Sequence, residues 1–334
     1  MKFYIPQWTI FCLAAVAAGS SVNAQTPVIA PTENLVTDGI PPIPAAIADT
    51  VRRYTESRSA GFVEWHPVRR EMLISTRFGN TPQLHLVKMP GGARRQLTFF
   101  NEPVGNASWE PKTGRYFVFS KDIGGNEFGQ LNRYDVATGT VALLTDGGRS
   151  QNGGIVWNHA KDRFLYSTTR RNGADRDIWI MDPLNPKESK PIAELTGGGW
   201  AGLDWSADDS QIVAMESISV NKTNLWTIDV KTGAKTPISD LAAQVAYGGA
   251  EFSKDGKGLY ITSDKDNEFQ RLALINLASG DVTYLTSEIP WDVDGFELSP
   301  DGATIAFLTN EAGVSKAYMM DTSWRSQHEC SAHP

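Results

Sequence analysis

The chain has 334 residues, of which 41% are hydrophobic, and a formal net charge of −7. Ten tryptophans and 30 glycines suit a globular, turn-rich β protein, and the composition excludes a disordered chain. The negative charge argues against nucleic acid as a partner. The length allows one large all-β domain or two ordinary domains.

Residues 1–24 are predicted to be a secretory signal peptide. Lys2 supplies the positive start, residues 10–18 form a short apolar run, and residues 22–24 offer a small-x-small cleavage site. An uncleaved N-terminal anchor is the alternative. Cleavage would leave Cys330 as the only thiol, which excludes an intrachain disulfide and a zinc site built on paired cysteines. We therefore expect a periplasmic or secreted protein with no membrane span after cleavage.

Residues 25–60 form a proline-rich lead-in, in which residues 45–54 are predicted to form a short helix. Residues 33–39 have an apolar centre and could supply a strand that closes the last unit of the repeat that follows. A linker along the surface is the alternative.

Residues 61–322 carry an internal repeat. One large residue recurs near the start of a short strand, with steps of 44, 48, 48, 47 and 46 residues, at Trp65, Trp109, Trp157, Trp205, Phe252 and Leu298. This period is typical of a β-propeller built from four-stranded blades. The sequence therefore predicts an all-β fold, a propeller of about six four-stranded WD40-like blades. The large side chains are expected to pack between blades.

The second unit of the repeat shows the pattern in full. Strands are predicted at 107–109, 115–120 and 130–135, and a fourth strand ends at Leu144-Thr145. Thr-Gly and Asp-Gly pairs lie between the strands, where glycine adopts a positive φ without steric penalty. The repeated Asp and Thr residues are expected to cap the turns by bonding to backbone groups.

The pattern stops after Asp321-Thr322. Residues 323–334 show neither strand alternation nor a closing Leu-Thr pair. The sequence therefore predicts that the last blade is incomplete and that residues 323–334 are an aberrant tail, as a truncation or a reading-frame change would produce.

A search for a serine nucleophile in a Gly-x-Ser-x-Gly turn finds only partial matches. Three segments begin the pattern, but Asn23, Asn152 and Ala317 stand where the closing glycine is required. No catalytic residue is therefore assigned, and the chain is predicted not to be an enzyme.

Metal and anion sites are predicted to be absent as well. His66, His85 and His159 are interpreted as turn and surface histidines, since a metal site would require them to meet across blades. Residues 264–268 resemble the opening of a calcium loop but lack the glycine and glutamate it needs, so an acidic hairpin loop is preferred. The arginines at 170, 171 and 176 could hold an anion, but a solvated loop is preferred. No metal or cofactor is expected.

The repeat resembles the WD40-like Ser-Pro-Asp-Gly repeat of TolB and of the N-terminal propellers of prolyl oligopeptidase-family serine peptidases. The motif stands at residues 299–302, and a related Ser-Ala-Asp-Asp follows Trp205. Residues 40–44, 74–79 and 94–100 are similar to secreted bacterial members of the peptidase family in particular. In that family a hydrolase domain with a Ser, Asp and His triad follows the propeller. No residue of this chain matches that triad.

The resemblance implies a non-catalytic propeller of a prolyl oligopeptidase-like peptidase, which at most gates or binds peptides. A TolB-like periplasmic module that binds envelope proteins is the alternative. A propeller polysaccharide lyase is a third hypothesis, which would require converging His, Gln or carboxylate ligands. The oligomeric state is not predicted.

Overall fold

The computed structural model of the chain describes residues 27–323 and 327–329. The chain divides into two compact units, residues 1–58 and residues 59–334. The predicted signal peptide, residues 1–24, lies outside the described residues. Among the residues that are described, no helix is long and apolar enough to cross a membrane.

The first unit contains one helix and an extended segment. Helix α1 (Ala45–Thr55) covers the predicted helix and buries none of its residues. Ahead of it, Val28 forms an isolated antiparallel bridge with Pro44, and the Ile29 N–H donates to the Ile43 carbonyl at 2.9 Å. Residues 33–39 contain turns and bends and no strand, so the expected closing strand is not formed there.

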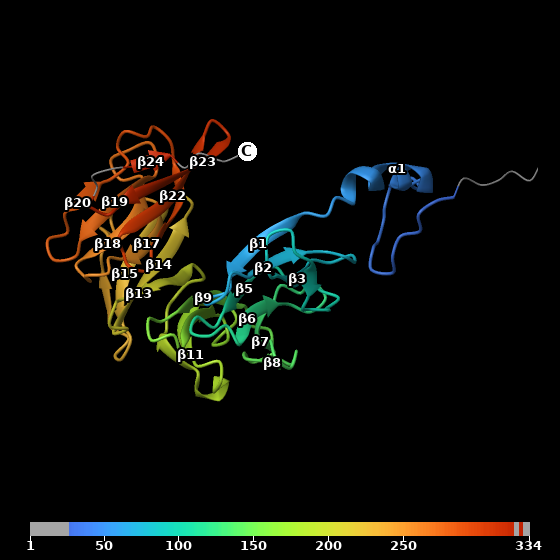
Figure 1. The fold of residues 1–334 in the computed structure, drawn as a ribbon, viewed down its shortest axis with the longest axis horizontal. Helices are drawn as coiled ribbons and strands as arrows, with labels where there is room; N and C mark the ends of the chain where they lie inside the picture. The colour runs from blue at the N-terminus through green and yellow to red at the C-terminus, as the bar shows by residue number, and fades with distance from the viewer. Residues whose placement is uncertain (1–26, 324–326, 330–334) are drawn as a thin grey trace, which may run out of the picture. The chain divides into compact units, whose positions relative to one another are not determined.

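The second unit consists of six four-stranded antiparallel sheets, each with its strands in chain order (Figure 1). We call them blades one to six. Blade one comprises β1 (Ala60–Trp65), β2 (Met72–Thr76), β3 (Gln83–Val87) and β4 (Arg94–Gln96). Blade two comprises β5 (Ala107–Trp109), β6 (Tyr116–Lys121), β7 (Gln130–Asp135) and β8 (Val141–Leu143). Blade three comprises β9 (Asn152–Trp157), β10 (Phe164–Thr168), β11 (Asp177–Met181) and β12 (Lys190–Ala193), with a 3-10 turn η1 (Pro186–Glu188) before β12.

The remaining blades repeat this order. Blade four comprises β13 (Trp200–Trp205), β14 (Gln211–Ser219), β15 (Lys222–Asp229) and β16 (Lys235–Pro237). Blade five comprises β17 (Tyr247–Phe252), β18 (Gly258–Ser263), β19 (Arg271–Asn276) and β20 (Val282–Tyr284). Blade six comprises β21 (Val293–Leu298), β22 (Thr304–Glu311), β23 (Val314–Asp321) and β24 (Gln327–Glu329). The predicted all-β propeller of about six four-stranded blades is confirmed.

The prediction of an incomplete last blade is wrong. Strand β24 pairs antiparallel with β23, with Met320 opposite Gln327 and Tyr318 opposite Glu329. The other fourth strands are also only three or four residues long, three in β16 and β20 and four in β12. A strand this short is held through its backbone by the neighbouring strand, so it needs no alternating side-chain pattern that a sequence search could detect.

The first strand of each blade, its inner strand, is irregular at a recurring place. In five blades the pairing register between the first and second strands is irregular. The irregularity lies two to four residues before the large residue of the repeat. The shifts occur between Phe62 and Glu64 in β1 and between Gly202 and Asp204 in β13, and such a bulge bends the strand and increases its twist. Glycines lie at or next to these positions in most blades, where a bend is least costly.

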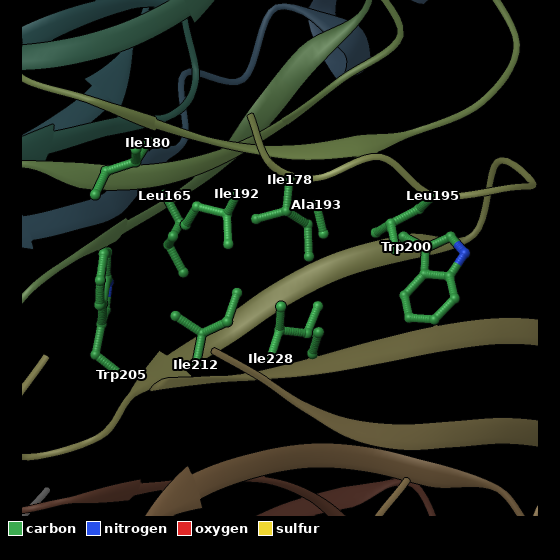
Figure 2. Packing of buried hydrophobic residues seen from close by; sticks show 11 residues of the cluster. Leu165, Ile178, Ile180, Ile192, Ala193, Leu195, Trp200, Trp205, Ile212 and Ile228 are labelled. Atoms are coloured by element: carbon green, nitrogen blue, oxygen red, sulfur yellow. The ribbon is translucent and has the colours of Figure 1, made fainter. Parts of the chain in front are cut away.

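In blades two to six, the large residue of the inner strand packs against the preceding blade. We call this set the anchor residues: Trp65, Trp109, Trp157, Trp205, Phe252 and Leu298. Figure 2 shows Trp205 of blade four beside Leu165 and Ile180 of blade three, together with Ile212 of its own blade. Trp109 packs in the same way among residues of blades one and two. The predicted packing between blades is confirmed for these residues. Trp65 differs, because its side chain is exposed.

The turns between third and fourth strands are capped as predicted. Asp135 accepts hydrogen bonds from the Ala137 and Thr138 N–H groups and from the Thr138 hydroxyl, at 3.0–3.1 Å. Asp229 has the same arrangement with Lys231 and Thr232. The repeated Asp and Thr residues therefore stabilise turns.

Candidate functional site on the inner strands

The residue before each anchor residue hydrogen-bonds to the next blade at all five junctions. The Glu64 carboxylate accepts from the Trp109 N–H, and the Asp204 carboxylate accepts from the Phe252 N–H at 2.9 Å. The Glu251 carboxylate accepts from the Leu298 N–H at 3.2 Å. At the other two junctions the indole N–H of the next anchor residue donates instead, from Trp157 to the Ser108 hydroxyl and from Trp205 to the Val156 carbonyl, both at 3.0 Å.

The backbone N–H of an anchor residue can bond to the neighbouring blade because it makes no hydrogen bond to the second strand of its own blade. The Glu110 N–H donates to the Tyr116 carbonyl at 3.0 Å, so this pair is a hydrogen-bonded pair of the antiparallel ladder. The adjacent pair, Trp109 opposite Phe117, is then a non-hydrogen-bonded pair. The Trp109 N–H therefore points away from its own sheet, toward the Glu64 carboxylate of blade one.

The inter-blade carboxylates have raised pKa values. Burial raises the pKa of Glu64 to about 7, although the hydrogen bond from Trp109 acts in the opposite direction. Burial, followed by repulsion from the Glu297 carboxylate, raises the pKa of Glu251 to about 7. Burial also raises the pKa of Asp204 and of Glu297, and the negative charge of Asp204 adds to the increase at Glu297. With a pKa of about 7, Glu64 and Glu251 change charge close to neutral pH.

An open hollow of about 230 Å³ lies on the inner strands of blades four to six. It is lined by Leu203, Gly248, Gly249, Ala250, Glu251, Thr262, Gly295 and Phe296. The glycines leave space that larger side chains would fill, and Glu251 contributes a carboxylate to the wall. The volume suits one side chain of a ligand better than a whole drug-sized molecule. Near the acidic residues Asp204, Glu251 and Glu297, a cationic group would be favoured.

A larger hollow of about 530 Å³ lies at the turns of blades five and six. Its wall includes Lys254, Asp255, Lys257 and Asn276. Lysines and an aspartate alternate along this turn, so the hollow has no single charge that would select a ligand. We therefore place the candidate site at the inner strands.

The three propeller histidines lie apart from the hollow. His66 lies in the turn after β1, as expected, and its Nδ1 accepts the Val68 and Arg69 N–H groups at 3.2 Å, but its side chain is buried. His85 is buried too, which corrects the expectation of a surface histidine. The His66 ring lies 4.7 Å from the Trp109 ring, and the His85 ring meets Phe78 edge to face at 4.8 Å. Burial lowers the pKa of both histidines. His159 is exposed, as expected, and its ring contacts the Trp205 carbonyl at 3.1 Å.

The remaining sequence-predicted candidates bond to neighbouring groups of the protein. Within the described ranges, no group of three or more His, Cys, Asp or Glu residues could hold a metal ion. Asp264, at the start of the acidic loop, accepts the Ala246 N–H at 2.8 Å. Arg171 is not simply solvated, because it pairs with the buried Asp177 at 2.8 Å. Ser150, from a partial Gly-x-Ser-x-Gly match, is buried and donates to Asp146 in the same turn.

Sequence reasoning missed the carboxylates before the anchor residues. The signal was present in the repeat, because an acidic residue precedes the anchor residue in blades one, four, five and six, as Glu64, Asp204, Glu251 and Glu297. An alignment of the six units on their anchor residues would have found it.

No family model matches the sequence, and no curated protein matches it. Solved structures do match its fold. A prolyl endopeptidase matches with a TM-score of 0.69 at 12% identity, over 86% of this chain and 45% of that chain. TolB from Acinetobacter baumannii matches with a TM-score of 0.54 at 16% identity, over 84% of this chain and 67% of that chain. An oligogalacturonate lyase in complex with manganese matches with a TM-score of 0.64 at 14% identity, over 80% of this chain and 77% of that chain.

At these identities the likeness is one of fold. The resemblance to propellers of the prolyl endopeptidase and TolB kind is therefore confirmed at the level of the propeller. The chain spans about half the length of the prolyl endopeptidase it matches.

Proposed function

We propose that this chain is the non-catalytic propeller portion of a prolyl oligopeptidase-like serine peptidase, and that it binds or gates peptides at the hollow beside Glu251. The match to a prolyl endopeptidase over 86% of this chain supports the class of protein. The catalytic serine that attacks a substrate peptide would then belong to a hydrolase domain, and the propeller would only bind the peptide.

The group of Asp204, Glu251 and Glu297 carries the proposal. These residues come from three successive blades. Burial is the main cause that raises their pKa values, repulsion from Glu297 and Asp204 adds to it at Glu251, and repulsion from Asp204 adds to it at Glu297. A bound cation relieves this repulsion, and the inner-strand glycines leave room for a side chain to reach it. A lysine or arginine side chain of a peptide, or its N-terminal ammonium, has the required charge.

Binding is tested with two blocked tripeptides, acetyl-Ala-Lys-Ala-amide and the same peptide with norleucine in place of lysine. Isothermal titration calorimetry should detect binding of the lysine peptide at pH 8, where Glu251 is ionised, and weaker binding of the same peptide at pH 6. The norleucine peptide controls for chain length and apolar contact. Glu251→Gln should weaken the lysine peptide selectively. Equal binding of the two peptides would refute the role of the carboxylates.

The absence of catalysis is tested separately. The purified chain should not hydrolyse a proline-containing peptide. Turnover that stays with the protein through successive columns, and that a serine-directed reagent blocks, would overturn the non-catalytic assignment while leaving the peptide-binding result unaffected.

We also infer export to the periplasm or the medium, from Lys2, the apolar run and the small-x-small site of residues 1–24. Expression of the full chain in a Gram-negative host, followed by fractionation and N-terminal sequencing, should find Gln25 as the first residue outside the cytoplasm. An intact N-terminus in the cytoplasmic fraction would contradict export.

A further inference from the structure

Two hollows lie at the same place in two blade junctions and differ in size. The hollow between blades three and four has a volume of about 210 Å³, and its wall includes Arg163 and Asp209. In the hollow between blades five and six, of about 530 Å³, Gly258 and Gly302 stand at the same positions relative to their anchor residues. Glycine has no side chain, so the second hollow is larger.

In the smaller hollow, the Asp209 carboxylate of blade four bonds to the turn after β9 of blade three. It accepts from the His159 N–H at 2.8 Å, from the Ala160 N–H at 3.0 Å and from the side-chain amide of Asn158 at 3.0 Å. Successive backbone N–H groups of a turn form a concave site that favours an anion. Blade four thus supplies a carboxylate to an anion site on blade three.

The turn after β17 in blade five has the same backbone conformation as the turn after β9. The Gly256 N–H donates to the Ser253 carbonyl at 2.8 Å, as the Lys161 N–H donates to the Asn158 carbonyl at 3.0 Å. Gly256 and Lys161 both have a positive φ, of 69° and 59°. The N–H groups of the second and third residues of the two turns therefore point the same way.

Between blades five and six, no carboxylate of the next blade reaches these N–H groups. Gly302, with a φ of 71°, has the backbone conformation of Asp209, with a φ of 58°, but it has no side chain to extend toward blade five. Within the described ranges, no residue of another blade accepts from the Lys254 or the Asp255 N–H. The larger hollow thus lacks the carboxylate that its counterpart contains.

Tyr260 adds a second polar group without a partner to this hollow. Its side chain lines the hollow and is 5% exposed, and its hydroxyl bonds to no residue of the described part of the chain. Burial, followed by the charge of Asp255, raises the pKa of Tyr260, so the hydroxyl keeps its proton at neutral pH. The hydroxyl can therefore donate a hydrogen bond to a bound anion.

The mixed charges of the wall do not select a ligand by themselves, but they differ in how far they are already used. The Asp255 carboxylate accepts from a hydroxyl and from the Lys257 N–H within its own turn, at 2.6 and 3.0 Å. The charge of Lys254 acts also on Glu251 and Glu297 of the inner strands. The ammonium group of Lys257 and the backbone N–H groups are therefore the main partners for an anion.

We propose that the hollow between blades five and six binds an organic carboxylate, in the position that the Asp209 carboxylate has between blades three and four. The ligand would accept from the Lys254 and Asp255 N–H groups and from the Tyr260 hydroxyl, and Lys257 would add a positive charge. A volume of about 530 Å³ suits a molecule of the size of an N-acyl amino acid. The carboxyl end of a peptide has the same chemistry. This site is independent of the proposed peptide site on the inner strands.

Binding is measured on the purified full chain by isothermal titration calorimetry at pH 7, with N-acetylphenylalanine and with its amide. The amide has the same size and the same ring but no charge. We expect the acid to bind at least about tenfold more tightly, since hydrogen bonds to a charged acceptor are the stronger ones. Inorganic phosphate, the third probe, should not displace the acid at equal concentration.

A longer acid distinguishes the two sources of the carboxylate. Acetyl-Ala-Ala-Phe with a free carboxyl end should bind more tightly than N-acetylphenylalanine if the ligand is the end of a peptide. Equal binding of the two acids would identify a free small acid as the ligand. Either result supports the carboxylate site.

Gly302→Asp places a carboxylate of the chain itself in the hollow and should abolish binding of the acid. Aspartate tolerates the left-handed φ of this position, and the Lys254 side chain, which a Cβ would meet, is flexible. Gly313→Asp is the matched control. Gly313 also has a positive φ, a Cβ there would meet nothing within 4 Å, and the variant should bind the acid as the wild type does.

Tyr260→Phe removes only the hydroxyl and does not depend on the folding of the glycine variants. It should weaken binding of the acid by about tenfold. The midpoint of thermal unfolding of the free chain should stay unchanged, because the hydroxyl has no partner there. A residue that served packing alone would leave binding of the acid unchanged in this variant.

Three results would overturn the proposal. The acid and the amide could bind equally, which would mean that the carboxylate makes no contact. The acid could bind Gly302→Asp as tightly as the wild type, which would place it elsewhere on the protein. Phosphate could displace the acid at equal concentration, which would show a site for anions in general.

Discussion

The Glu251 carboxylate accepts the backbone N–H of Leu298, 47 residues farther along the chain, at 3.2 Å. The same bond recurs between Glu64 and Trp109 and between Asp204 and Phe252. These carboxylates have little hydration at the blade junctions, so they make the stability of the propeller depend on pH.

Glu251→Gln should flatten the decrease in stability between about pH 4.5 and pH 7. The pKa of Glu251 is raised from 4.5 to about 7 in the folded protein, so its contribution is complete below pH 4.5 and is lost as the pH rises through 7. The glutamine oxygen can still accept the Leu298 N–H, but it does not ionise. Urea unfolding of both proteins at several pH values measures the difference.

Glu311→Gln is the control for this prediction. The hydrogen bond from Tyr318 is the first cause that lowers the pKa of Glu311, so its contribution is lost only as the pH falls below its unfolded value of 4.5. This variant should keep the wild-type slope between pH 5 and pH 7. Parallel slopes for wild type and Glu251→Gln would contradict a raised pKa at Glu251.

Trp205→Ala should destabilise the protein by about 3–5 kcal/mol, because it opens a cavity between blades three and four. The Trp205 ring is fully buried among Leu165, Ile180 and Ile212. Trp65→Ala, at the equivalent position of blade one, should cost less than about 1 kcal/mol, since the ring is exposed. Denaturant unfolding followed by circular dichroism compares the two. Similar losses would mean that Trp65 is covered in solution.

Gly114→Ala should cost more than Gly124→Ala, although both glycines have a positive φ, of 65° and 60°. A Cβ at position 114 would lie 2.3 Å from the His66 Nε2, whereas a Cβ at position 124 would meet nothing within 4 Å. Backbone strain alone costs about 1–2 kcal/mol at either site. The clash with the buried His66 should add about 1–3 kcal/mol at position 114. Thermal unfolding of the two variants should separate these contributions.

Arg171→Met should destabilise blade three by about 3–5 kcal/mol, because it leaves a buried charge without its cation. Asp177, whose side chain is 1% exposed, bonds to Arg171 at 2.8 Å. Arg163→Met is the matched control, since Arg163 and Asp162 form an exposed pair at 3.2 Å, and it should cost less than about 1 kcal/mol. Equal unfolding midpoints for the two variants would contradict the importance of Asp177 burial.

The blades could be predicted from the sequence because the anchor residues and the turn residues repeat. Trp109 and Trp205 are large enough to mark each unit, and pairs such as Thr138-Gly139 mark the turns between them. Both signals are local. Each depends on the residue type at one position, which a single sequence reports directly.

The inter-blade hydrogen bonds and the last strand could not be predicted in the same way. Glu64 and Trp109 are 45 residues apart, and their contact depends on how one blade is placed on the next. At the equivalent position blade two has Ser108 and blade three has Val156, so no single residue type marks the contact. Strand β24 depends on the free edge of β23, which no residue of β24 reveals.

The hydrogen bonds at the junctions also have a direction. In each of them the acceptor is made before its donor, so Glu64 emerges from the ribosome 45 residues ahead of Trp109, and Asp204 emerges 48 residues ahead of Phe252. A blade can therefore complete its sheet during translation but gains its junction only when the next inner strand has been synthesised. Assembly in the order of synthesis is thereby favoured, with each new blade securing the one made before it.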